Sequence, residues 1–171
     1  MVVQIVFIGL SSGVPKPPLM ATGTIDQEQL ARLPALLSDS ATQGLFRVVH
    51  LHHCPLPGHE KWRKRLTNAP AVQDILRKYG AELIIHGHGH RAHCHELDTR
   101  SGTAPVIAVP SASALGLHGA DVASYNCYQV EPSPEGWRLE IHSRQYQPQN
   151  GNFEAGESRV LDLERERPGS E

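Results

Sequence analysis

The stretch that decides the fold is VVHLHHCPLPG, residues 48–58, together with its counterpart ELIIHGHGHRAH, residues 82–93. Each begins as an apolar run typical of a buried strand and continues into histidines and a turn rich in small residues or proline. Ligands of an α/β sheet gather at the carboxyl ends of its strands, so both stretches should bring imidazoles to one edge. The sequence therefore predicts an α/β protein with a histidine-rich site at that edge.

The segments around these two stretches alternate between strand and helix patterns. Asn68 is the expected cap of a helix that has Pro70 in its first turn and stops at Gly80. The order β-α-β-α-β predicts a mainly parallel sheet with covering helices. The expected strands are 2–8, 46–51 and 82–85, the expected helices are 26–37 and 68–79, and the strands expected after His90 are 92–98, 104–109, 124–131 and 137–146. We assign residues 1–150 to one domain and residues 151–171 to a polar C-terminal tail that frays at its end.

Composition excludes several classes of protein. The 171 residues carry a net charge of −2, with 39% hydrophobic and 20% charged residues, as in a globular domain. This balance argues against nucleic acid or a membrane as the partner. The opening MVVQIVFIGL lacks the basic leader of a signal peptide. Three cysteines, an odd number, indicate reduced thiols and a cytoplasmic location.

Three histidines are the candidate metal ligands: His52, His88 and His90. In extended backbone, side chains two residues apart point the same way, so the side chains of His88 and His90 should point in the same direction. Imidazole suits zinc, manganese, iron or cobalt, and three protein ligands with one open position is a catalytic arrangement. Lone histidines such as His50 and His118 are interpreted as satisfied surface or core residues. Structural or supporting roles compete with ligand roles at His53, His86, His93 and His95, although His93-Cys94-His95 also admits a zinc site.

The spacing of these motifs resembles a known family. His-His-x-Pro after one strand and Gly-His-x-His after the next resemble the last two metal motifs of calcineurin-like metallophosphoesterases, above all the cyclic-nucleotide phosphodiesterase-like branch. Cys54 stands where that branch has the first proline of His-His-Pro-Pro. GLSSGVPKPPLMATGTIDQEQLARL (9–33), the helix between the motifs and VPSASALG (109–116) are similar to its connecting segments, so the likeness spans most of the chain.

The resemblance implies a sandwich of two sheets with outer helices and a two-metal site. His52 and His88 would bind one ion and His90 the neighbouring ion, which would be zinc, manganese or iron. The implied reaction is hydrolysis of a small phosphodiester or phosphotriester by water that the metal activates. His53 is the candidate catalytic residue, as a proton donor in place of one that the family supplies elsewhere.

The family's other motifs are absent: Asp-x-His, Gly-Asp and Gly-Asn-His-Asp or its Glu variant. They supply the bridging carboxylate, further ligands and the histidine that protonates the leaving group. The chain therefore looks like the C-terminal half of the domain, with one sheet face left for a partner. A second copy is the expected partner, giving a homodimer. A fragment that binds metal without turnover is the alternative function.

A serine hydrolase is a second alternative. Gly9-Leu10-Ser11-Ser12-Gly13 fits G-x-S-x-G after a strand, with histidines and Asp121 downstream. A nucleophile elbow needs a helix directly after its serine, and Pro15, Pro17 and Pro18 disfavour one there. The basic run Lys61-Trp62-Arg63-Lys64-Arg65 fits a phosphate-binding patch, although a solvated face is favoured.

Overall fold

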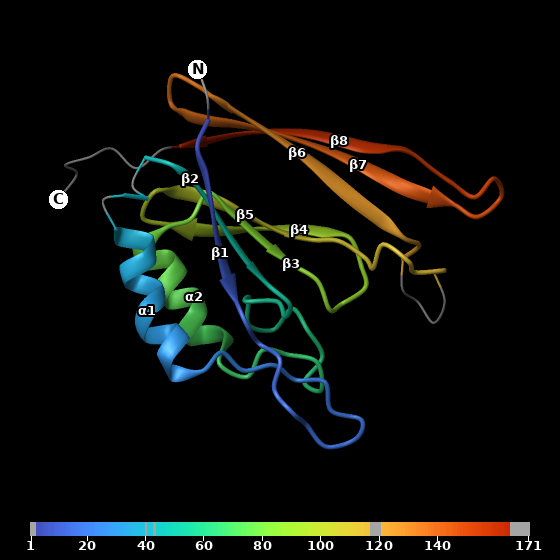
Figure 1. Cartoon of the computed structure of the whole chain (residues 1–171), viewed down its shortest axis with the longest axis horizontal. Helices are drawn as coiled ribbons and strands as arrows, with labels where there is room; N and C mark the ends of the chain where they lie inside the picture. Colours follow the sequence, from blue (N-terminus) through green and yellow to red (C-terminus); the bar gives the residue numbers. More distant parts are fainter. Residues whose placement is uncertain (1–2, 40, 43, 117–120, 165–171) are drawn as a thin grey trace.

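A computed structural model describes residues 3–39, 41–42, 44–116 and 121–164, which form two sheets and two helices. Helices α1 and α2 lie on one side of a five-stranded sheet, and a three-stranded sheet crosses its other side (Figure 1). The elements are β1 (Ile5–Leu10), α1 (Gln27–Ser38), β2 (Phe46–Leu51), α2 (Ala69–Tyr79), β3 (Leu83–His86), β4 (His93–Thr99), β5 (Gly102–Ala108), β6 (Ser124–Pro132), β7 (Gly136–Gln147) and β8 (Asn152–Glu164). The predicted α/β class is confirmed.

The five-stranded sheet has the order β1-β2-β3-β5-β4. Strands β1, β2, β3 and β5 run parallel, and β4 pairs antiparallel with β5. Because β2 and β3 are neighbours, their carboxyl ends bring both histidine stretches to one edge of the sheet. The predicted placement of the two stretches is therefore confirmed.

Each helix begins and ends where local chemistry favours it. Asp26 caps α1 by accepting a hydrogen bond from the Gln29 backbone N–H at 2.8 Å. Gly80 ends α2 with a positive φ of 74°. Asn68 precedes α2 as predicted, but its side chain makes no capping bond. Its amide instead exchanges hydrogen bonds with both backbone groups of Ile25, which ties α2 to the segment before α1.

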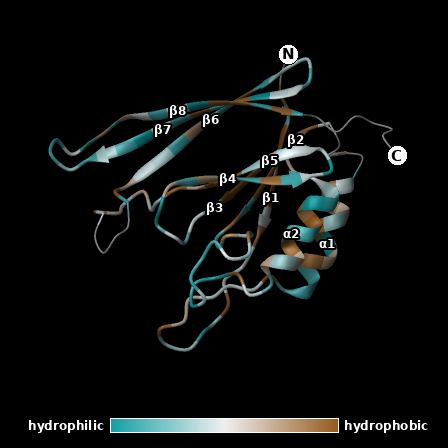
Figure 2. Cartoon of the chain, turned by 180° about the vertical axis from the view of Figure 1, so that it is seen from behind, coloured by the Kyte–Doolittle hydropathy of each residue, from teal (hydrophilic) through white to brown (hydrophobic). Residues whose placement is uncertain are grey.

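One apolar core lies between the helices and the five-stranded sheet. The sheet supplies Val49, Ile84 and Val106, all fully buried. The helices add Leu33, Leu37, Val72 and Leu76. Figure 2 shows hydrophobic residues along the parallel strands, while the far end of the β7–β8 hairpin is hydrophilic. This core holds the strand ends in fixed positions.

A second core lies on the opposite face of the same sheet, the face expected to lack a partner. Phe46, on this face, packs its ring against Trp137 of β7 with centroids 5.8 Å apart. The other members of this core are Val48, Leu83, Ile107, Leu139, Ile141 and Leu163. Strands β6–β8 of the same chain therefore cover this part of the face. The sequence analysis had identified β6 and β7 but not the sheet that they build.

Strand β8 occupies residues 152–164, which the sequence analysis assigned to a polar tail. It pairs antiparallel with β7 along its length. Only Leu163 of this strand is buried, so an alternating apolar pattern was absent from the sequence. Backbone hydrogen bonds rather than side-chain burial hold β8 in the sheet. The expected fraying at the C-terminus falls on residues 165–171, outside the described residues.

An ion pair is buried at the opposite end of the sheet from the histidines. Arg47 and Glu82 form it, with side chains 3% and 4% exposed. The Glu82 carboxylate accepts hydrogen bonds from the Arg47 side chain at 2.7 and 2.9 Å and from the Arg47 backbone N–H. Arg47 also donates to the carbonyls of Leu37 and Tyr79, the first in α1 and the second in α2. This pair joins β2, both helices and the start of β3.

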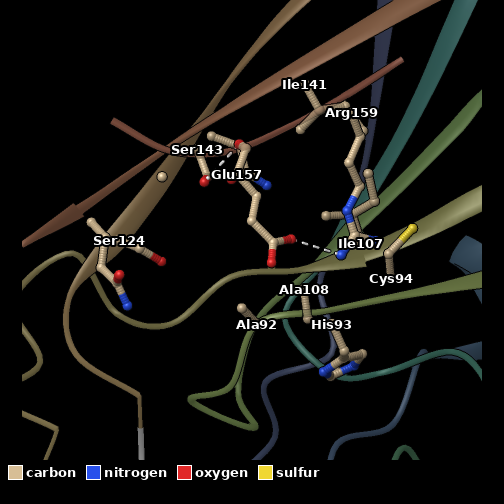
Figure 3. A pocket seen from close by; sticks show the side chains of 13 residues that line it. Ala92, His93, Cys94, Ile107, Ala108, Ser124, Ile141, Ser143, Glu157 and Arg159 are labelled. Atoms are coloured by element: carbon tan, nitrogen blue, oxygen red, sulfur yellow. Dashed lines mark hydrogen bonds and ion pairs between the residues drawn. The ribbon is translucent and has the colours of Figure 1, made fainter. Parts of the chain in front are cut away.

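A cavity of about 330 Å³ separates the two sheets near β4 and β6. Glu157 and Arg159 form an ion pair of 3.0 Å above Ile107 and Cys94, and His93 lines the lower side (Figure 3). All three cysteines, Cys54, Cys94 and Cys127, are free thiols. None of the helices in the described ranges is both long and apolar enough to span a membrane.

Candidate metal centre

His52 and His88 form the centre of the candidate site. His52 directly follows β2, and His88 lies two residues beyond β3. The Gly87 N–H donates to the His52 carbonyl at 3.1 Å, which fixes the two strand ends side by side. His88 Nδ1 and His52 Nε2 are joined by a hydrogen bond of 2.9 Å, in which one ring donates its N–H to the other. Two nitrogens on one zinc ion, each bound at about 2.0–2.1 Å, are separated by roughly 2.9–3.4 Å, so this spacing suits a shared ion.

The second ring nitrogen of His88, Nε2, is buried and has no hydrogen-bond partner. Burial, followed by the neighbouring His53 and His52, lowers the pKa of His88 to about 4. The imidazole is therefore neutral at pH 7, which is the form that binds metal ions. His88 also has a positive φ of 65°, a strained conformation that the loop retains.

His90, the third predicted ligand, lies apart from this pair. Its side chain is exposed, and its carbonyl accepts a hydrogen bond from the Asp121 N–H at 2.9 Å. The prediction that His88 and His90 face the same way assumed extended backbone. Both residues instead have positive φ, 65° and 55°, so they belong to a turn. As folded, no three or more His, Cys, Asp or Glu side chains of the described residues are grouped to hold a metal ion.

The site supplies two of the ligands that a transition-metal ion would need. His52 and His88 present facing nitrogens at ligand spacing, whereas a third ligand has to move into place. His90 lies on the same turn as His88, and its side chain is exposed. Zinc, manganese and iron all accept imidazole, so the residues do not select one of them.

His53, the candidate catalytic residue, is 4% exposed. Its Nε2 lies 3.1 Å from the Ala21 carbonyl, and its Nδ1 lies 2.7 Å from the Ser12 hydroxyl. Since a carbonyl only accepts, Nε2 carries the proton and Nδ1 accepts from Ser12. Burial lowers the pKa of His53. Both nitrogens are therefore occupied, and service as a proton donor would require breaking these hydrogen bonds.

Ser11, the alternative nucleophile, does not have the geometry of an elbow. It is exposed, and its N–H donates to the Gln29 side chain at 2.7 Å. The next helix begins only at Gln27, so no helix directly follows the serine. The serine in contact with a histidine is Ser12, which is 1% exposed and holds His53 in place. The sequence contains no signal that distinguishes Ser12 from Ser11 in this respect.

The basic run 61–65 borders the candidate site. Backbone carbonyls of Arg63 and Arg65 accept hydrogen bonds from Ala21 and Gly23, beside the buried His53. The positive charge of Lys64 is close enough to contribute to the lowered pKa of His88. Lys64 therefore places positive charge near His88, while Lys61, Trp62, Arg63 and Arg65 are exposed, in agreement with the solvated face that the sequence analysis favoured.

A second group of imidazoles, which we call the second histidine cluster, comprises His59, His86, His93 and His95. Neighbouring rings in it have centroids 4.2 to 5.2 Å apart. The sequence analysis left structural and ligand roles open for His86, His93 and His95, admitted a zinc site at His93-Cys94-His95, and did not single out His59. The cluster forms because β5 lies between β3 and β4 in the sheet. The sequence alone does not reveal this strand order.

Comparisons with known proteins find fold neighbours but no family. No family model matches the chain, and no curated protein matches it. A double mutant of Vps29 from Entamoeba histolytica matches with 15% identity over 92% of this chain and 99% of that chain, at a TM-score of 0.41. Chaetomium thermophilum Vps29 matches with 14% identity over 95% of this chain and 97% of that chain, at a TM-score of 0.39. The fold class therefore rests on the strands and helices of the chain itself.

Proposed function

We propose that the chain is a metal-dependent phosphoester hydrolase that acts on phosphodiesters or phosphotriesters with good leaving groups. The observation that carries the proposal is the His52–His88 pair, whose facing nitrogens lie 2.9 Å apart at the ends of β2 and β3. The order of the motifs, which resembles that of metallophosphoesterases, supports the same chemistry. When bound, zinc, manganese or iron would lower the pKa of a water molecule and offset phosphate charge.

The residues around the site would have separate roles in binding the metal and the substrate. His52 and His88 would hold the ion, and His90 would reach it by rotation of an exposed side chain. Lys64 and its basic neighbours would attract the negatively charged phosphoester toward this edge. The buried hydrogen bonds of His53 to Ser12 and Ala21 would keep the loop after β2 in position.

The proposed preference for good leaving groups follows from His53. A general acid is typically worth about 10²–10⁴-fold, and its value grows with the basicity of the leaving group. Both ring nitrogens of His53 are engaged, and within the described residues no other side chain donates a hydrogen bond to the His52–His88 pair. Aryl oxides leave without a proton, so aryl esters should react far faster than alkyl esters such as cyclic nucleotides.

The experiment is a comparison of kcat/KM across phenyl phosphodiesters of graded leaving-group pKa, with metal-loaded protein. We expect a steep negative dependence in the parent and loss of activity in His88→Gln. His142→Gln, on β7 outside the site, is the matched control and should behave as the parent. A flat dependence would mean that a group such as His53 or a histidine of a second copy donates the proton. Bound metal without turnover would instead favour the inactive metal-binding fragment.

A homodimer remains part of the proposal. Ile5 and Phe7 of the edge strand β1 are 43% and 67% exposed. Phe7 pairs in register with Val48 of the second core, so it lies on the sheet face that β6–β8 cover only in part. A second copy would bury these side chains. Light scattering should give a dimer for the parent and a monomer for Phe7→Ser; a monomeric parent would contradict this.

A further inference from the structure

The second histidine cluster lies outside the His52–His88 pair and shares no residue with it. His59 comes from the loop after β2, His86 ends β3, and His93 and His95 begin β4. The ring centroids lie 5.2 Å apart for His86–His93, 4.8 Å for His93–His95 and 4.2 Å for His59–His95. Two imidazoles that share a tetrahedral zinc ion have centroids roughly 5 Å apart, given zinc–nitrogen bonds of about 2.0–2.1 Å. The four rings therefore form a continuous group at ligand spacing.

Two buried nitrogens of the cluster have no hydrogen-bond partner among the residues that the structure describes. His86 is 2% exposed, and its Nδ1 lies 3.2 Å from the Gly87 carbonyl. Because the carbonyl accepts, Nδ1 carries the proton and Nε2 presents a lone pair. That Nε2 has no partner, nor does the buried Nε2 of His93. A histidine that donates one N–H to a backbone carbonyl and points its other nitrogen elsewhere has the orientation of a metal ligand.

A purely structural role does not account for these unpartnered atoms. Leaving one buried polar group unsatisfied costs about 1–3 kcal/mol, and the cluster contains two. His53, which is 4% exposed, shows the structural arrangement, because both of its nitrogens are hydrogen-bonded. The contrast indicates that His86 and His93 are held for a ligand that the chain itself does not supply.

The remaining members of the cluster supply further donors near the surface. His59 Nδ1 lies 3.2 Å from His95 Nε2, a pair of facing nitrogens like that of His52 and His88. Glu60 follows His59, and its carboxylate lies against Gly89 and close enough to His93 to affect the pKa of that imidazole. A carboxylate there would offset the charge of a divalent cation. His93 also lines the cavity between the sheets (Figure 3).

We propose that the second histidine cluster binds a divalent transition-metal ion, zinc above all, independently of His52 and His88. As folded, no three of these side chains in the described part of the chain are grouped closely enough to hold a metal ion. Binding therefore requires rotation of the exposed His59 and the half-buried His95 toward the fixed nitrogens of His86 and His93. Imidazole donors suit zinc, and four of them complete its tetrahedral preference.

The test is a titration of the metal-stripped full chain with Zn²⁺, and with Co²⁺, whose absorption reports ligand geometry. We expect two binding steps in the parent. His59→Asn/His95→Asn should weaken one step by at least about tenfold, since even an indirect partner of a metal ligand is worth 10–100-fold. Both replaced residues lie toward the surface, and thermal unfolding checks that the fold is retained. His142→Asn is the matched control and should titrate as the parent.

The complementary variant separates this proposal from the proposed function. His52→Ala/His88→Ala should retain the step that His59→Asn/His95→Asn loses. If the His52/His88 variant binds as much metal as the parent, the proposed hydrolase site fails while the second site stands. If the His59/His95 variant, or His59→Asn alone should the double variant not fold, titrates as the parent, the second site is refuted.

Discussion

Buried polar groups are paired at one end of the parallel sheet and include unpaired ring nitrogens at the other end, among the described residues. At the amino end of β2, Arg47 and Glu82 satisfy each other through three hydrogen bonds, and Arg47 also binds two helix carbonyls. At the carboxyl ends of β2 and β3, ring nitrogens of His86 and His88 are buried with no partner. Burying a polar group is costly unless it is paired. The first end therefore stabilises the fold, and the second is where the proposed metal sites lie.

The largest expected effect concerns the ion pair at the amino end. Glu82→Ala leaves the Arg47 guanidinium buried without its carboxylate, so the free energy of unfolding should fall by about 3–5 kcal/mol. The exposed pair Arg32–Glu28, with side chains 73% and 72% exposed, is the matched control. Glu28→Ala should cost no more than about 1 kcal/mol. Urea unfolding followed by circular dichroism measures both.

The double variant Arg47→Met/Glu82→Leu sharpens this result. Replacing both charges by apolar groups removes the desolvation cost along with the attraction, so stability should recover relative to Glu82→Ala. If Glu82→Ala and Glu28→Ala lowered the free energy of unfolding equally, the Arg47–Glu82 ion pair would not stabilise the amino end of the sheet.

A smaller effect is expected at the loop that supports His53. A methyl group at Gly23 would overlap the His53 ring. Gly23→Ala should therefore destabilise the protein by about 1–3 kcal/mol through overpacking. Gly13, in the same connecting segment, has no atom within 4 Å of its Cβ position, and Gly13→Ala is the control. Thermal unfolding that gave equal midpoints for both variants would contradict the packing of His53.

The Ser12–His53 hydrogen bond should contribute less to the free energy of unfolding than the packing around Gly23. Ser12→Ala leaves His53 Nδ1 without a donor and should cost about 1 kcal/mol or more, whereas the exposed Ser11→Ala should be close to neutral. Phosphoesterase activity should survive Ser11→Ala within about tenfold, which corresponds to 1.4 kcal/mol. A complete loss of activity in Ser11→Ala would revive the serine-hydrolase hypothesis.

The last and smallest expected effect is a difference in thiol reactivity between two cysteines, which involves no change in stability. Cys54 is 2% exposed, and burial raises the pKa of its thiol to about 11. Alkylation requires the thiolate, so Cys54 should resist iodoacetamide at pH 8 while the exposed Cys127 reacts. Mass spectrometry of the labelled peptides measures which of the two cysteines is alkylated first. Rapid labelling of Cys54 would mean that the loop beside His52 opens readily.

Sequence patterns predicted the parts of the fold that apolar burial determines. The strand 46–51 was placed at its observed bounds, and His52 and His88 were correctly expected at one sheet edge. Strand β8 was missed because its side chains are mostly exposed and carry no apolar alternation. The turn at His88 and His90 was missed because positive φ at non-glycine residues has no sequence signal. The second histidine cluster depends on a strand order that the sequence analysis did not derive.

The most direct test of the central claim is the transition-metal content of the purified chain, measured by elemental analysis after gel filtration. The account predicts that the parent and His142→Ala retain metal at the carboxyl edge. His52→Ala/His88→Ala should lose the equivalent held by that pair, with the fold intact by circular dichroism. Metal content in His52→Ala/His88→Ala equal to that of the parent would contradict the claim that this pair is a metal centre.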